Sequence, residues 1–199
     1  MPQISLTDFV DIVSSSGTPK ATKVRQVKRR PPYDPASDFY RRIREAIIQV
    51  HQDDQPKEAI DRLLTTLNDP KKMRTYPTVA SGYKKWWGRK SLIWFEPPSK
   101  QYSAFDVDVS VNPELGLDVE GKPHLIKLYF KNNPLDKNKV DIITHLMSVA
   151  LSPLCTSPTT MSVLDVRKAK LISPTVPIPT LNGMLQAELA YISALWPSV

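Results

Sequence analysis

The chain has 199 residues, of which 41% are hydrophobic and 24% charged, and its formal net charge is +7. These values are typical of a globular protein with one domain of ordinary size. No stretch approaches the roughly 20 apolar residues of a membrane span, and the first residues lack a secretory signal, so we expect a cytoplasmic protein without a membrane partner. The single cysteine, Cys155, excludes an internal disulfide and a cysteine-based zinc site.

The positive charge is concentrated in two segments. Residues 20–30 contain six basic residues and residues 71–90 contain seven, with no acid in either segment, whereas the rest of the chain has more acidic than basic residues. Localised positive charge is typical of proteins that bind polyanions, because cations that neutralise phosphates release bound counterions. The alternative is that these lysines and arginines lie on solvated helix faces.

The first half of the chain predicts helices. In residues 4–14 apolar side chains recur at helical spacing after Ser5 or Thr7 as the N-cap. The next residues, as far as Pro32, show no core-forming pattern, so we expect a basic arm that lies across the domain surface. Three more helices are expected: from Ser37 to about Asp54, from Pro56 to Leu67, and from Pro77 to Gly88.

The second half predicts strands that alternate with two helices. Strands are expected over residues 91–95, 104–111, 115–119, 124–130, 161–166 and 168–172. Helices are expected from Asp136 or Asn138 to Ser152 and from Leu181 to Trp196. The run from His124 to Phe130 is apolar on both faces except for Lys127, which is typical of a central strand covered on both sides. A lysine in such a strand needs an anionic partner, unless its ammonium group reaches solvent along Tyr129.

These elements predict a mixed α/β fold. We expect a central, mostly mixed sheet of four to six strands, flanked by helices, with an N-terminal helical segment and a C-terminal helix. Residues 1–36 are expected to form the short helix and the basic arm. Residues 37–199 are expected to form a single α/β domain, helical over 37–88 and sheet-containing over 89–199.

Residues 77–166 follow the order helix, strand, strand, strand, helix, strand. This order resembles the αβββαβ core of the PD-(D/E)XK, or restriction-endonuclease-like, superfamily, and the resemblance covers about half of the chain. In that superfamily the second strand supplies an acid, and the third supplies an acid and a lysine separated by one residue. The acids bind Mg²⁺, and the lysine orients the attacking water or stabilises the developing charge.

The resemblance implies that Lys127 is the lysine of the third strand. It implies that Glu114, which follows Pro113, or Asp118 beyond it is the acid that precedes Lys127, so the implied catalytic residues are Lys127, Glu114 and Asp118, with Glu114 and Asp118 binding Mg²⁺. The sequence departs from the family pattern at Leu125, where an acid is expected. A two-acid metal site cannot be assembled from these positions alone, so the resemblance implies either a divergent Mg²⁺-dependent phosphodiesterase or a member that has lost catalysis.

A second candidate site combines cations with aromatic residues. Lysine and arginine suit phosphates, and exposed aromatic rings can stack on bases. On a helix Tyr83 and Trp87 share an apolar face, which leaves Trp86 as the candidate for exposure. We therefore expect nucleic-acid contacts from Lys84, Lys85, Trp86, Arg89 and Lys90 and, in the basic arm, from Lys28, Arg29 and Arg30.

The sequence thus favours a nucleic-acid-binding protein of nuclease-like fold, with DNA favoured over RNA. A hypothesis from a different class is a non-enzymatic subunit that docks a protein partner through its N-terminal segment and its basic surface. Binding to duplex DNA that weakens steeply with salt would separate the two hypotheses. The three histidines show no zinc spacing, and no function is assigned to them.

Overall fold

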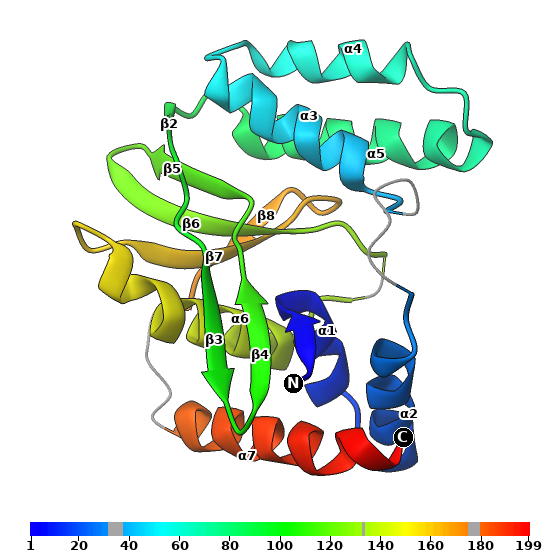
Figure 1. The fold of residues 1–199 in the computed structure, drawn as a ribbon. Helices are drawn as coiled ribbons and strands as arrows, with labels where there is room; N and C mark the ends of the chain where they lie inside the picture. Colours follow the sequence, from blue (N-terminus) through cyan, green and yellow to red (C-terminus); the bar gives the residue numbers. More distant parts are fainter. Residues whose placement is uncertain (32–37, 133, 175–179) are drawn as a thin grey trace.

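The computed structural model of the protein describes residues 1–31, 38–132, 134–174 and 180–199. These residues form two β-sheets and the helices around them (Figure 1). The mixed α/β class predicted from the sequence is confirmed, with a five-stranded mixed sheet flanked by helices. Within these ranges no helix combines the length and the apolar character that a membrane-spanning helix needs.

The larger sheet has the strand order β2-β5-β6-β7-β8. Its strands are β2 (Leu92–Phe95), β5 (Leu115–Val119), β6 (Lys122–Tyr129), β7 (Thr160–Asp165) and β8 (Lys170–Ile172). Strands β2, β5 and β6 form an antiparallel meander, β6 and β7 are parallel, and β8 is antiparallel to β7. The parallel pair is connected by α6 (Lys137–Leu151), as a parallel pair requires, and Asp136 caps the helix by accepting a hydrogen bond from the Lys139 amide.

Strand β6 lies at the centre of this sheet and is covered on both faces. Side chains alternate across a strand, so Leu125 packs in one core while Ile126 and Leu128 pack in the other. Lys127 shares the face of Leu125. The apolar pattern on both sides of β6 therefore reflects two separate hydrophobic cores.

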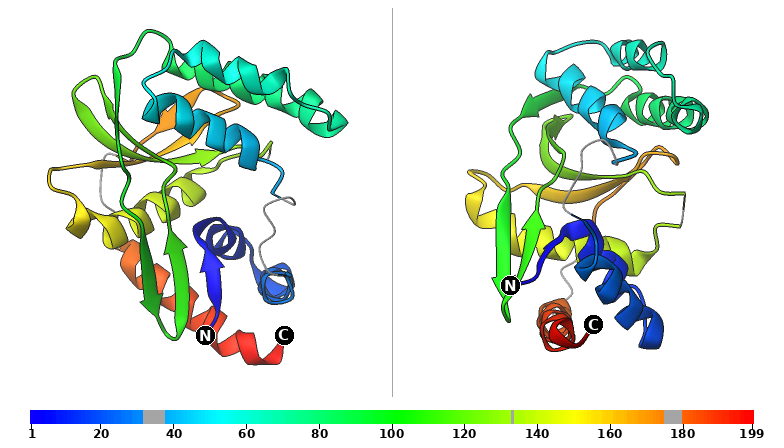
Figure 2. Two further views of the ribbon diagram at one scale, coloured as in Figure 1. Left: turned by 45° about the horizontal axis from the view of Figure 1, so that its top comes forward. Right: turned by 45° about the vertical axis from the view of Figure 1, so that its right-hand side comes forward.

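One core lies beneath a helical layer formed by α3 (Arg41–Gln52), the 3₁₀ turn η1 (Lys57–Ile60), α4 (Asp61–Leu64) and α5 (Pro70–Trp87), as Figures 1 and 2 show. Tyr76 and Tyr83 are its largest fully buried side chains. Gly82 allows α5 to approach the end of β7, because a Cβ atom at this position would overlap the Val166 carbonyl group. The position of α5 on the sheet thus depends on a residue without a side chain.

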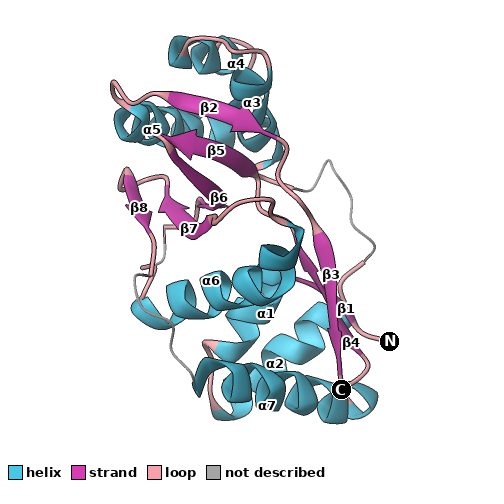
Figure 3. Ribbon diagram, turned by 90° about the vertical axis from the view of Figure 1, so that its left-hand side faces the viewer, coloured by secondary structure: helices cyan, strands magenta, loops and turns pink. Residues whose placement is uncertain are grey.

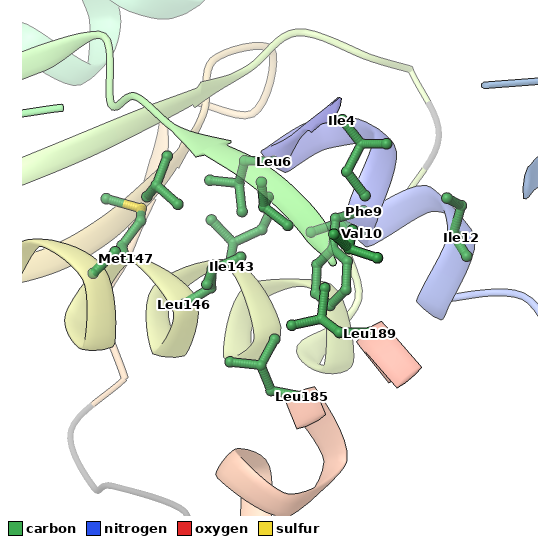
Figure 4. Close-up of a cluster of buried hydrophobic side chains, with 14 of the residues drawn as sticks. Ile4, Leu6, Phe9, Val10, Ile12, Ile143, Leu146, Met147, Leu185 and Leu189 are labelled. Carbon is green, nitrogen blue, oxygen red and sulfur yellow. The ribbon is translucent and has the colours of Figure 1, made fainter. Parts of the chain in front are cut away.

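The other core lies between α6, the N-terminal segment and the smaller sheet (Figures 3 and 4). The N-terminal segment forms β1 (Gln3–Ser5), α1 (Leu6–Val13) and α2 (Gly17–Lys28), and β1 joins a sheet of order β1-β4-β3. The two other strands of that sheet are β3 (Lys100–Ala104) and β4 (Val107–Val111), and α7 (Thr180–Leu195) lies against α6. The short 3₁₀ turns η2 (Ser152–Leu154) and η3 (Trp196–Ser198) follow α6 and α7.

The expectation of a basic arm without core contacts is wrong for residues 17–28. They form α2, whose Val24 is fully buried in the same core as Leu6 and Phe9 of α1. A single buried side chain gives no periodic pattern, which is why the sequence predicts an arm here. The boundary expected between residues 36 and 37 and the helix start expected at Ser37 lie outside the described residues, but the segment before them shares its core with α6 and α7.

Other elements also differ from the sequence-based prediction. Strand β1 was not predicted, and the helix expected from Pro56 to Leu67 is the 3₁₀ turn η1 followed by α4. The strand expected over 104–111 is a hairpin, because Phe105 and Asp106 take positive φ angles of 51° and 57° and reverse the chain between β3 and β4. The helix expected to begin at Pro77 begins at Pro70, with Asp69 as its N-cap, and Pro77 lies inside it. The longer α5 changes which side chains share its exposed face.

Candidate functional site

Lys127 and Glu114 form an ion pair at the edge of the core that lies between α6, the N-terminal segment and the smaller sheet. Glu114 lies between β4 and β5, and its Oε1 atom is 2.7 Å from the Lys127 Nζ atom. Its second oxygen, Oε2, accepts a hydrogen bond of 2.8 Å from the Leu128 amide, and Lys127 also donates to the Asn112 carbonyl oxygen at 3.3 Å. Both side chains are only 12% exposed. Glu114 is therefore the anionic partner that a lysine in this strand requires.

The pair lines a cavity of about 160 Å³ between α1, the start of α3 and β6. Charged side chains of both signs line this cavity, and they are paired with one another. Lys131 contacts Asp11 at 2.5 Å, and Arg44 contacts Asp38 at the same distance. The cavity thus has a polar wall whose charges largely compensate each other.

The structure does not bring Asp118 to this pair. Asp118 stands opposite Pro123 in the β5–β6 hairpin, whereas the Glu114 amide donates to the Ile126 carbonyl oxygen near the other end of β5. Four residues of strand separate the two acids, which is about 13 Å. The Asp118 Oδ1 atom instead accepts a hydrogen bond of 2.6 Å from the Gly121 amide and so stabilises the turn.

The residues present do not fit a Mg²⁺ site of the kind that the superfamily resemblance implies. Leu125, at the position of the missing acid, is fully buried in the core. In the described part of the chain, no three histidine, cysteine, aspartate or glutamate side chains are grouped so that they could hold a metal ion. Glu114 alone supplies fewer carboxylates than a two-acid site needs, and it is already engaged by Lys127 and by a backbone amide.

In the first basic segment, two of the three residues predicted to contact nucleic acid have partners within the fold. Lys28 donates a hydrogen bond of 2.6 Å to the Trp196 carbonyl oxygen. Arg30 forms two hydrogen bonds with Asp8, of 2.8 and 3.0 Å, and this contact raises the pKa of the Arg30 guanidinium. Arg29 is exposed. Lys28 and Arg30 thus fasten α2 to neighbouring elements.

In the second basic segment, two of the predicted cations also have internal partners. Lys84 contacts both oxygens of Asp61, at 2.6 and 2.7 Å, and so joins α5 to α4. Lys90 donates to the Trp86 carbonyl oxygen at the end of α5. Lys85 and Arg89 are exposed, and neither has an ion pair among the contacts of the described residues.

The expectation that Trp86 is the exposed tryptophan is wrong. Its side chain is 4% exposed and packs in the core beneath α5, whereas Trp87 is half-buried and stacks on His51 with ring centroids 4.4 Å apart. The buried face of α5 contains Tyr76, Val79, Ala80, Tyr83 and Trp86, which follow helical spacing from a start at Pro70. The sequence interpretation exchanged the two tryptophans because it considered only the last three turns of the helix.

The opposite face of α5 carries a feature that the sequence interpretation missed. Several of its exposed residues are spaced by three or four positions and therefore lie in a row along one side of the helix. We call this row, together with the exposed arginine that follows the helix, the α5 stripe; it consists of Lys71, Arg74, Thr78, Ser81, Lys85 and Arg89. The sequence places Lys71 and Arg74 in the basic segment 71–90 but does not predict that they align with Lys85, because the helix is expected to begin after them, at Pro77.

The α5 stripe is an uncompensated cationic surface. The described residues provide no ion pair to its four cations, and the nearest acid in the sequence, Asp69, is engaged as the N-cap. Hydrogen bonds from the Lys71 and Lys72 amides lower the pKa of the Asp69 carboxyl. Like charges on one helix face repel each other, so such a row contributes no stability to the helix by itself.

Beneath the stripe, α5 is anchored by a buried polar contact. The His51 Nε2 atom lies 2.5 Å from the Tyr83 hydroxyl, and His51 is 6% exposed. Burial lowers the pKa of His51 to about 4 and raises that of Tyr83 well above its usual value, so both groups are neutral at pH 7. This contact joins α3 to α5.

Comparison of the chain with protein-family models, with curated proteins and with solved structures found no match.

Proposed function

We propose that the protein binds the phosphate backbone of nucleic acid through the α5 stripe. The observation that carries this proposal is the alignment of three exposed cations, Lys71, Arg74 and Lys85, along one helix face, followed by the exposed Arg89 just beyond the helix; none of the four has an ion-pair partner among the described residues. A folded protein gains nothing from such an alignment, whereas a phosphate backbone gains one charge contact from each cation. The two hydroxyl groups of Thr78 and Ser81, which lie between the cations, are suitable donors to phosphate oxygens.

The proposed activity is binding and not hydrolysis. The order α5, β2, β5, β6, α6, β7, with the β3–β4 hairpin inserted after β2, agrees with the order of elements in the PD-(D/E)XK core. Lys127 lies in the strand β6 that corresponds to the third strand of that core and Glu114 directly precedes β5, but the position of the second acid is occupied by the buried Leu125. In this proposal the pair holds the loop before β5 against β6.

The binding proposal can be tested by fluorescence anisotropy with a labelled 20-base-pair duplex at several salt concentrations. Wild-type affinity should fall steeply between about 50 and 200 mM salt. In the triple variant Arg74→Gln/Lys85→Gln/Arg89→Gln, the slope of log K against log salt should decrease by about 2.7, since each lost phosphate contact removes about 0.9.

The matched control is Lys100→Gln/Lys122→Gln/Lys170→Gln, which removes three exposed cations outside the α5 stripe. The control should keep the wild-type slope. The same loss of slope in both variants would show that only net charge matters and would contradict the proposal. Absence of duplex binding at 50 mM salt would overturn it in favour of a protein-docking subunit.

The absence of hydrolysis is tested separately, by incubating the duplex with the wild type and the Lys127→Ala variant in the presence of Mg²⁺ or Mn²⁺. We expect no cleavage above background from either protein. Cleavage by the wild type that is lost in Lys127→Ala would contradict the supporting role assigned to the pair.

A further inference from the structure

The proposed function leaves open whether the α5 stripe is suited to a single strand or to a duplex. Proteins that bind single strands combine a charged groove with exposed aromatic rings, on which successive bases stack. Proteins that bind duplexes without reading sequence contact the two phosphate backbones on either side of a groove. The two modes require different side chains between the cations.

The aromatic residues of α5 are not available for stacking. Tyr76 and Tyr83 are fully buried, Trp86 is 4% exposed, and the half-buried Trp87 is stacked on His51. Along the α5 stripe itself the side chains between the cations are Thr78 and Ser81. The surface therefore lacks the rings that would favour unpaired bases.

The cations are also distributed in two groups. Lys71 and Arg74 lie in the first turns of α5, whereas Lys85 and Arg89 lie at and just beyond its last turn. At 1.5 Å per residue, Arg74 and Lys85 are separated by about 16 Å along the helix axis, and Lys71 and Lys85 by about 21 Å. The two groups are thus held apart by a rigid helix with small uncharged side chains between them.

This spacing exceeds the major-groove width of about 12 Å, so one group can reach each backbone at the edges of a groove. Small side chains in the middle avoid collision with the duplex. We infer that the α5 stripe spans a groove of double-stranded nucleic acid, with Lys71 and Arg74 on one backbone and Lys85 and Arg89 on the other. This inference rests on the proposed function and specifies its partner.

The two ends of the α5 stripe should then contribute separately and about equally. The variant Lys71→Gln/Arg74→Gln removes one group, and Lys85→Gln/Arg89→Gln removes the other. Each should reduce the salt slope for the duplex by about 1.8, and the quadruple variant by about 3.6. A loss confined to one pair would contradict contact with two backbones.

The partner class is tested by competition. A labelled 20-base-pair duplex bound to the wild-type protein is displaced with the unlabelled duplex or with either of its separated strands at 50 mM salt. We expect the duplex to compete at least tenfold better than either strand. Equal or better competition by a single strand would overturn this inference and leave the proposed function standing, whereas failure of the labelled duplex to bind at all would overturn the proposed function itself.

Discussion

The two basic segments of the sequence form the helices α2 and α5. The two helices differ in how many of their cations have partners within the fold. In α2, Lys20 pairs with Glu188 of α7 and Lys28 binds the Trp196 carbonyl oxygen, and just after the helix Arg30 pairs with Asp8. In α5, Lys84 pairs with Asp61, but the cations of the α5 stripe form no ion pair with the described residues. Three cations of the first segment are thus bound within the fold, whereas the cations of the α5 stripe remain exposed to solvent.

The difference shows that charge density alone does not identify a binding surface. Both segments are acid-free runs of lysine and arginine, and they differ in the alignment of their exposed cations and in the acids that the fold brings to them. The exposed cations of α2 and its C-cap are Lys23, Arg25 and Arg29; Lys23 lies on a different side of the helix from the other two, so no more than two of them share a face. Alignment of the unpaired cations on one face is therefore the more informative criterion.

Replacement of Lys127 by methionine should have the largest effect on stability, because it tests a cation that is paired and almost buried. Lys127→Met leaves the Glu114 carboxylate without its partner, and loss of one member of a buried pair costs about 3–5 kcal/mol. Chemical denaturation measures this loss. The double variant Lys127→Met/Glu114→Gln should recover part of it, and a single variant as stable as the wild type would show that the pair contributes nothing.

A smaller effect, on the dependence of stability on pH, is expected from His51 beneath α5. Its pKa is about 4 in the folded protein and near 6.5 in the unfolded chain, so between these values the unfolded chain binds a proton that the folded protein does not. Stability is therefore fully present above pH 6.5 and falls as the pH decreases towards 4, by about 3 kcal/mol from this group.

The variant His51→Phe keeps a ring against Trp87 but cannot be protonated. Because His124 and His145 remain in both proteins, the difference between the two stability curves isolates His51. Unfolding free energies at pH 7 and pH 4.5 should differ less in the variant than in the wild type. Parallel curves would mean that His51 is protonated in the folded protein and that charge beneath α5 is tolerated.

The position of α5 on the sheet depends on Gly82. This position determines the direction in which the α5 stripe faces. A Cβ atom there would overlap the Val166 carbonyl group, so Gly82→Ala should lower the free energy of unfolding by about 2 kcal/mol. Gly183 of α7 is a matched control, since a Cβ atom there meets nothing within 4 Å. Gly183→Ala should stabilise the protein by about 0.5–1 kcal/mol, because alanine favours the helix. Destabilisation by both substitutions would argue against a specific close approach at Gly82.

The smallest effect compares one fastening cation with one cation of the α5 stripe. Arg30→Gln should cost at most about 1 kcal/mol, because the Arg30 side chain is 55% exposed and its pair with Asp8 is screened by solvent. Lys85→Gln should leave stability unchanged or slightly higher, since it removes repulsion within α5. Thermal unfolding of the two variants at low salt measures the contrast, and a larger loss in Lys85→Gln would indicate an internal role for Lys85.

The sequence predicted most of the larger sheet and the neighbourhood of Lys127, because these depend on local patterns. The alternation of β5 and β6, the turn near Gly121 and the cap at Asp136 can be read from adjacent residues. The two motifs that place Glu114 beside Lys127 are thirteen positions apart and are joined by a single hairpin. Short-range information was sufficient there.

The sequence could not predict features that depend on distant partners. The acid that pairs with Lys20 is Glu188, and Lys28 binds the carbonyl group of Trp196, so nothing near α2 indicates that it is fastened. The start of α5 was misplaced because proline is favoured at the first turn of a helix, and both Pro70 and Pro77 meet that description. Because of this error of seven residues, the sequence did not predict that Lys71 and Arg74 align with Lys85, and it exchanged the environments of the two tryptophans.

The central claim, that α5 and not α2 is the polyanion surface, is tested most directly by the salt dependence of duplex binding in two triple variants. The α5 variant is Arg74→Gln/Lys85→Gln/Arg89→Gln, and the α2 variant is Lys23→Gln/Arg25→Gln/Arg29→Gln, which removes the exposed cations of α2 and its C-cap. Both are measured at a temperature at which circular dichroism shows them to be folded. The account predicts that the slope of log K against log salt falls by about 2.7 in the α5 variant and stays near the wild-type value in the α2 variant. An equal loss of slope in both, or a loss in the α2 variant alone, would contradict it.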